Sequence, residues 1–156
     1  MEKNIREILN EDVFEWYPNR YPFKSYINSI MNFVDMNGVI AVAGLFVPKF
    51  IEQNGHIFLK ENVKNRLEKN KLFPCPLGKD KRTTERYYNL FNLEEFFILT
   101  ADESSSDIRM VKKLGELLVY FWSRRLKELF PEKQFLFEIK KNLYNEHGFC
   151  LTFWQE

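Results

Sequence analysis

The clearest pattern of apolar and polar positions lies between Ile108 and Phe130. Apolar residues recur there every three or four positions, so a helix gathers them on one side. They are Val111, Leu114, Leu117, Leu118, Phe121, Trp122, Leu126 and Leu129. We predict one long amphipathic helix near the C-terminus, with Ser106 or Asp107 as its N-cap and Pro131 just after its end.

Two other segments have the pattern of β-hairpins. Residues 49–60, KFIEQNGHIFLK, place apolar runs on either side of Asn54-Gly55, the dipeptide that best tolerates the positive φ angles of a type I′ turn. The C-terminal runs QFLFEIKK and GFCLTFWQ alternate between two faces and are joined by LYNEHG. In the last run, one face carries Phe149, Leu151 and Phe153, and the other Cys150, Thr152 and Trp154. Because an isolated hairpin is marginal in water, we predict that the four strands form one sheet.

The run from Gly38 to Val47 is apolar on every side, and Pro48 follows it. This pattern favours a buried helix. The run is about half as long as a membrane span, and the first residues, MEKNIREILNED, lack the apolar core of a signal peptide. We therefore expect a cytoplasmic α+β protein without membrane contact. Residues 1–156 would form a single domain, in which several helices pack with a four-stranded, mostly antiparallel sheet.

Charge is segregated along the chain although its net value is only +1. Basic residues outnumber acidic ones between Lys64 and Arg86, and the stretch from Glu94 to Asp107 contains acidic residues and no basic one. Such runs are usually solvated faces, but opposed patches also steer association with a partner. The interface candidates are Lys79, Lys81, Arg82, Arg86, Glu94, Glu95, Asp102 and Glu103. The basic stretch with Tyr87 and Tyr88 would also suit a nucleic acid, which the balanced charge and the missing recognition motif disfavour.

The sequence contains no familiar catalytic or metal-binding motif. Phosphate-binding glycine loops, paired C-x-x-C, H-E-x-x-H and G-x-S-x-G are all missing from it. Its histidines, His56 and His147, adjoin turn glycines and are interpreted as solvated turn residues. Cys75 and Cys150 are too few for a disulfide framework, and strand alternation disfavours a nucleophilic pair of Cys150 with His147. We expect no catalytic residue, metal or cofactor.

The C-terminal quarter resembles a pattern found in small uncharacterised bacterial α+β proteins, and the Asn54-Gly55 hairpin matches it loosely. The matching positions are Phe130, Pro131, Phe135, Phe137, Thr152, Phe153 and Gln155. Immunity against secreted toxins is ascribed to many proteins of this class, so the resemblance implies a non-enzymatic, protein-binding protein that masks a toxin through one charged face. The alternative is a small-ligand-binding protein or enzyme with a pocket between sheet and helices. Its polar candidates are Arg86, Tyr87, Arg124 and Arg125.

Overall fold

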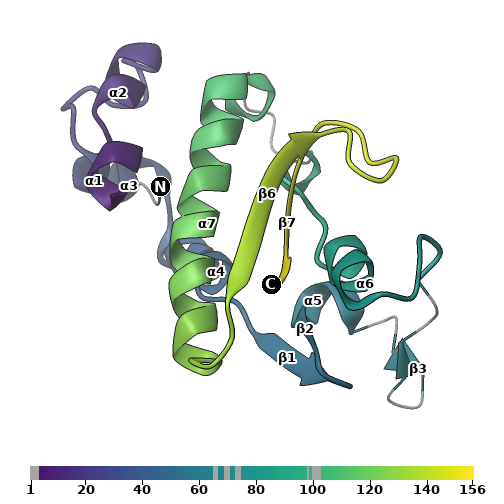
Figure 1. Ribbon diagram of the computed structural model, residues 1–156. Helices are drawn as coiled ribbons and strands as arrows, with labels where there is room; N and C mark the ends of the chain where they lie inside the picture. Colours follow the sequence, from purple (N-terminus) through teal and green to yellow (C-terminus); the bar gives the residue numbers. More distant parts are fainter. Residues whose placement is uncertain (1–3, 65–66, 69–70, 73–74, 98, 100–102) are drawn as a thin grey trace.

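The computed structural model describes residues 4–64, 67–68, 71–72, 75–97, 99 and 103–156, and it has an α+β architecture (Figure 1). The α-helices are α1 (Ile5–Ile8), α2 (Asp12–Trp16), α3 (Tyr26–Phe33), α4 (Met36–Phe46), α5 (Lys60–Val63), α6 (Lys81–Tyr88) and α7 (Ile108–Leu129). The short 3₁₀ helices are η1 (Glu95–Phe97) and η2 (Glu103–Ser106). The strands are β1 (Phe50–Gln53), β2 (His56–Leu59), β3 (Leu67–Glu68), β4 (Lys71–Leu72), β5 (Phe91–Asn92), β6 (Phe135–Lys141) and β7 (Phe149–Gln155).

The predicted long helix is confirmed as α7, and Asp107 is its N-cap. The inner side of α7 buries Val111, Leu118, Trp122 and Leu126 against the C-terminal strands. At Gly115 a Cβ atom would lie 2.8 Å from Ile139 Cδ1, so glycine permits the close approach of the helix to the sheet. The core of the molecule therefore lies between α7 and the C-terminal strands.

The C-terminal hairpin is also confirmed, with β6 paired to β7 from Phe135↔Gln155 to Lys141↔Phe149. The short strand β5 pairs with the other edge of β7, so the antiparallel order is β5-β7-β6. Leu151 and Phe153, which were predicted to share one face of this strand, pack on the α7 side. The opposite face of β7 lies toward α6, so β6 and β7 run between the two helices (Figure 1).

The first hairpin forms where it was predicted, with Asn54 at φ 51° and Gly55 at φ 79°. The prediction of one four-stranded sheet is wrong, however. Strands β1 and β2 form a two-stranded sheet, β3 and β4 form another, and β5, β7 and β6 form the third. The physical reason lies in α6, whose polar side chains occupy the place where β2 and β7 would otherwise have exchanged backbone hydrogen bonds.

Glu85 of α6 and Asn89, the C-cap of the same helix, are fully buried and join β2 to β7. The Glu85 carboxylate accepts hydrogen bonds from the Ile57 backbone N–H at 2.9 Å and from the Gln155 backbone N–H at 2.7 Å. Asn89 Oδ1 accepts from the Leu59 N–H, and Asn89 Nδ2 donates to Ile57 O. Its second Nδ2 bond goes to the Phe153 carbonyl. Main-chain groups of two separate sheets are thus satisfied by one helix.

The apolar run that was predicted to form a buried helix is a helix, but its burial was predicted wrongly. In α4 no residue is buried, and its last turn contacts α7. There Leu45 O accepts a hydrogen bond from Trp122 Nε1 at 2.9 Å, and the rings of Phe46 and Phe121 lie 4.9 Å apart. Within the described residues, no helix combines the length and the apolarity required to cross a lipid bilayer.

Candidate binding surfaces

The predicted basic face is largely engaged in contacts within the molecule. Lys81 Nζ donates to Gln155 Oε1 at 3.0 Å, and the Arg82 guanidinium carbon lies 5.1 Å from the centre of the Trp154 ring. Lys79 is exposed. The interface role of these residues stays a prediction, but their main contacts hold α6 against the end of β7.

Arg86 is the most enclosed of the predicted basic residues. Its guanidinium forms an ion pair with Glu138 and lies 4.7 Å from the centre of the Trp154 ring and 5.7 Å from that of Tyr144. Trp154 is only 7% exposed, so the arginine covers an aromatic side chain that would otherwise face water. Arg86 therefore stabilises the packing of α6 on the sheet.

The predicted acidic residues have different surroundings in the structure. Glu94 Oε1 accepts the backbone N–H of Phe149 at 2.9 Å, so this carboxylate closes the end of the C-terminal hairpin. Glu95 lines a cavity that is described below, Glu103 is exposed in η2, and Asp102 lies outside the described residues. The interface role of these acids also stays a prediction.

The histidines and cysteines do not assemble a nucleophile in the described structure. Cys150 is fully buried, and burial raises the pKa of its thiol, which disfavours the reactive thiolate. His147 is exposed, whereas the imidazole of His56 stacks on Phe58 with its Nδ1 3.8 Å from Glu85 Oε1. Within the described part of the chain, no group of three His, Cys, Asp or Glu side chains could hold a metal ion.

A surface that the sequence did not indicate is formed by residues 26–47, which we call the α3–α4 segment. Ten of its large apolar residues are exposed by 40% to 80%, whereas Leu45 and Phe46 pack against the core. The exposed residues are Ile27, Ile30, Met31, Phe33, Val34, Met36, Val39, Ile40, Val42 and Val47. The segment contains one charged residue, Asp35, whose carboxylate accepts the Gly38 N–H at the start of α4. The segment itself is therefore apolar and almost uncharged, and the guanidinium of Arg20 lies 5.6 Å from the ring centre of its Phe33.

A hollow of about 210 Å³ adjoins this segment and is lined by Ile30, Phe33 and Val34 together with tyrosines from the preceding loop. The rings of Phe14, Tyr21 and Tyr26 pack against one another beside it. Burial raises the pKa of Tyr26 to about 12, so this phenol stays protonated at neutral pH. The hollow thus has an aromatic wall and opens beside exposed apolar side chains.

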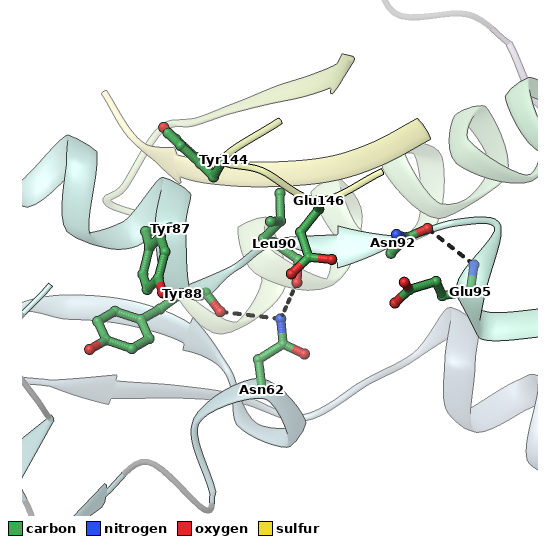
Figure 2. A pocket seen from close by; sticks show the side chains of 8 residues that line it. All are labelled: Asn62, Tyr87, Tyr88, Leu90, Asn92, Glu95, Tyr144 and Glu146. Carbon is green, nitrogen blue, oxygen red and sulfur yellow. Dashed lines mark hydrogen bonds between the residues drawn. The ribbon is translucent and has the colours of Figure 1, made fainter. Parts of the chain in front are cut away.

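A second cavity, of about 230 Å³, is polar and lies among α5, α6, β5 and the β6–β7 connection (Figure 2). Asn62 Nδ2 donates to the carbonyls of Tyr88 and Leu90. Asn92 Oδ1 accepts the backbone N–H of Glu95 at 3.1 Å. Figure 2 shows the carboxylate of Glu146 reaching from the opposite side toward Asn62.

The second cavity brings together only part of the small-ligand site that was predicted as the alternative. Tyr87 lines it, whereas Arg86 packs on Trp154. Arg124 lies over the ring of Tyr120 on α7, and Arg125 pairs with Glu128 at 2.7 Å. Neither α7 arginine lines this cavity or the hollow beside α3.

Comparison with known proteins does not assign either surface. No family model matches the chain, and neither the curated proteins nor the solved structures contain a match.

Proposed function

We propose that this protein binds a partner protein through the apolar surface of the α3–α4 segment. The observation that carries the proposal is α4, an apolar helix with no buried residue. A helix that is apolar on all sides normally lies inside a protein or an interface. Because α4 is exposed to water, its apolar surface would be buried by a second molecule, and we infer that this molecule is a partner protein.

The exposed area is large enough to form the centre of a specific interface. Fully burying one such side chain removes roughly 60–120 Å² from water, so side chains that are about half exposed offer on the order of 500 Å² together. Apolar patches of several hundred Å² mark interaction sites in soluble proteins, and each partner in a standard complex contributes ~800 Å². The hollow beside Ile30 and Phe33 would receive a protruding apolar side chain of the partner.

The charge of the segment favours a protein over a lipid surface as its cover. Helices that lie on membranes usually carry lysine or arginine on a polar face, which attracts anionic headgroups. The only charged residue of the α3–α4 segment is the acid Asp35. An uncharged, apolar protein surface matches it better, because no charge then has to be desolvated on binding.

Within this function, masking of a bacterial toxin is the specific role that we propose. It is supported by the resemblance of the C-terminal residues to immunity-like proteins and by a surface suited to a stable complex. The contact would then be centred on the apolar α3–α4 segment.

The experiment compares single charge insertions on and off the proposed surface. Ile40 and Leu77 are exposed by 66% and 49%, so Ile40→Glu and Leu77→Glu form a matched pair. A protein captured from the native host by the wild type is purified, and its affinity for each variant is measured by calorimetry. We expect a 1:1 complex that Ile40→Glu weakens at least ~10-fold, or ~1.4 kcal/mol, and Leu77→Glu leaves unchanged.

Two other results would overturn the proposal. Light scattering could show a dimer of this chain that Ile40→Glu dissociates, which would make a second copy the cover. Co-sedimentation with anionic vesicles, abolished by Ile40→Glu, would instead assign the surface to a membrane.

A further inference from the structure

The polar cavity offers hydrogen-bond acceptors from three directions. The carboxylates of Glu95 and Glu146 line it, one from η1 and one from the β6–β7 connection. The amide of Asn62 lines it from α5, and its nitrogen is used in bonds to backbone carbonyls, so its oxygen remains as a further acceptor (Figure 2). Among the described residues that line the cavity there is no lysine, arginine or histidine.

Aromatic rings complete the walls of this cavity. The ring centres of Tyr87 and Tyr144 lie 6.1 Å apart, and both residues line the space. The ring of Tyr144 also lies 5.7 Å from the guanidinium carbon of Arg86, which is itself paired with Glu138. Faces of aromatic rings attract cations, and alkyl groups also pack well against them. The walls therefore suit a molecule that is both cationic and partly aliphatic.

The cavity is held in shape by hydrogen bonds that need no ligand. The Asn62 amide is fixed by the carbonyls of Tyr88 and Leu90, at 3.2 and 2.7 Å. Asn92 Nδ2 donates to His147 O at 2.8 Å and so ties β5 to the loop that carries Glu146. Because these contacts order the walls in advance, binding would cost little further conformational entropy.

Negative charge gathers on the side of the cavity near Cys150, whereas the Arg86 guanidinium lies beside Tyr144 on the other side. The carboxylates of Glu146, Glu94 and Glu95 add to the effect of burial in raising the pKa of the neighbouring Cys150 thiol. A cation placed among these groups would lower their mutual repulsion.

We propose that this cavity binds an aliphatic diamine or polyamine. One protonated amine would lie between the carboxylates of Glu95 and Glu146, and the alkyl chain would pack against Tyr87. The volume of about 230 Å³ exceeds what a single metal ion fills and suits a short chain of carbon and nitrogen atoms. This site is separate from the α3–α4 segment, so the two proposals stand independently.

Calorimetric titration with spermidine and with putrescine tests the site. We expect saturable 1:1 binding that weakens at least ~10-fold in the double variant Glu95→Gln, Glu146→Gln. Both glutamates are exposed, so the double variant should fold. Glu132→Gln, which removes an exposed charge away from the cavity, should bind like the wild type, and so should Ile40→Glu. The uncharged analogue 1,4-butanediol should give no binding.

Several results would overturn the amine site. They are an absence of saturable heat with either amine, equal affinity in the double variant, and binding of butanediol as tight as that of putrescine. Complete displacement of spermidine by an equal concentration of Mg²⁺ would reassign the cavity to a metal ion. Loss of amine binding in Ile40→Glu would show that the two surfaces are not separate.

Discussion

Helices α7 and α4 are both rich in apolar residues, but only α7 is built into the core. In α7 the buried side chains follow helical spacing, and lysines and arginines occupy the rest of its surface. In α4 every side chain except that of Asn37 is apolar or absent, and none is buried. The comparison shows that apolar content alone does not place a helix in the core. A polar face also has to define which side is to be covered.

The different environments of the two helices suggest different roles. Trp122 of α7 is fully buried, and its ring has edge contacts with Phe50, Phe91 and Phe153. Ile40 of α4 is 66% exposed. Helix α7 thus organises the fold, whereas α4 leaves its apolar surface available for binding.

Truncating one side chain on each helix should give the largest difference in the free energy of unfolding. We expect Trp122→Ala to lower the free energy of unfolding by about 3–5 kcal/mol, because it leaves a large cavity and the Leu45 carbonyl without its donor. Ile40→Ala should change it by less than about 0.5 kcal/mol. Urea denaturation followed by circular dichroism measures both values. Comparable losses would mean that α4 is buried in solution.

A second test uses the glycine in each helix. A Cβ at Gly115 would meet Ile139 and Leu93 at 2.8 and 3.0 Å, whereas one at Gly44 would meet nothing within 4 Å. Alanine is the better helix former by about 1 kcal/mol. Gly44→Ala should therefore stabilise the protein by about 0.5–1 kcal/mol, and Gly115→Ala should destabilise it by about 1 kcal/mol. Thermal unfolding of the two variants should shift in opposite directions, and a shift in the same direction would contradict the difference in packing.

The smallest effect is expected at the aspartates that cap the two helices. Asp107 accepts the Arg109 N–H at 2.9 Å and is also bound by the guanidinium of Arg109 and the hydroxyl of Tyr17. The charged hydrogen bonds of Arg109 hold the pKa of Asp107 well below its ordinary value of ~3.9. Its stabilising contribution is therefore present above about pH 4 and is lost as the pH falls through the lowered pKa.

Asp107→Asn should accordingly cost about 0.5–1 kcal/mol near neutral pH, a modest value because solvent screens the pair. The difference from the wild type should shrink as the pH falls from about 5 to 2. Asp35→Asn at the start of α4 is the matched control, since asparagine caps a helix about as well as aspartate. Denaturation midpoints across this range provide the measurement, and a constant Asp107→Asn difference would rule out the ionic contribution.

Much of the fold could be predicted because its signals are local. The stripe of α7, the Asn54-Gly55 turn and the alternation of Phe149 to Trp154 each lie within one short segment. The separation of the sheets could not be predicted, because it depends on Glu85 and Asn89. Glu85 lies between Thr84 and Arg86, and Asn89 directly follows α6, so both are polar residues in a polar stretch that does not indicate burial.

The candidate sites were harder to predict for a related reason. Asn62, Tyr87, Glu95 and Glu146 come from α5, α6, η1 and the β6–β7 connection, and only the folded structure brings these four segments to one cavity. The charge segregation was visible in the sequence, but charge runs do not reveal which residues fold back onto the protein. Arg86 and Glu94 are examples, since both are engaged within the molecule.

The hydrogen bonds from Glu85 and Asn89 to β2 and β7 form a junction between two sheets, which we call the seam. This seam constrains how the sequence can evolve. A main-chain ladder survives almost any exchange of side chains, but this joint exists only while a carboxylate and an amide stand one turn apart at positions 85 and 89. Genetic drift at either position would loosen the first hairpin from the second while leaving each hairpin intact. Descendants of this chain should thus keep both residues or replace the whole seam at once.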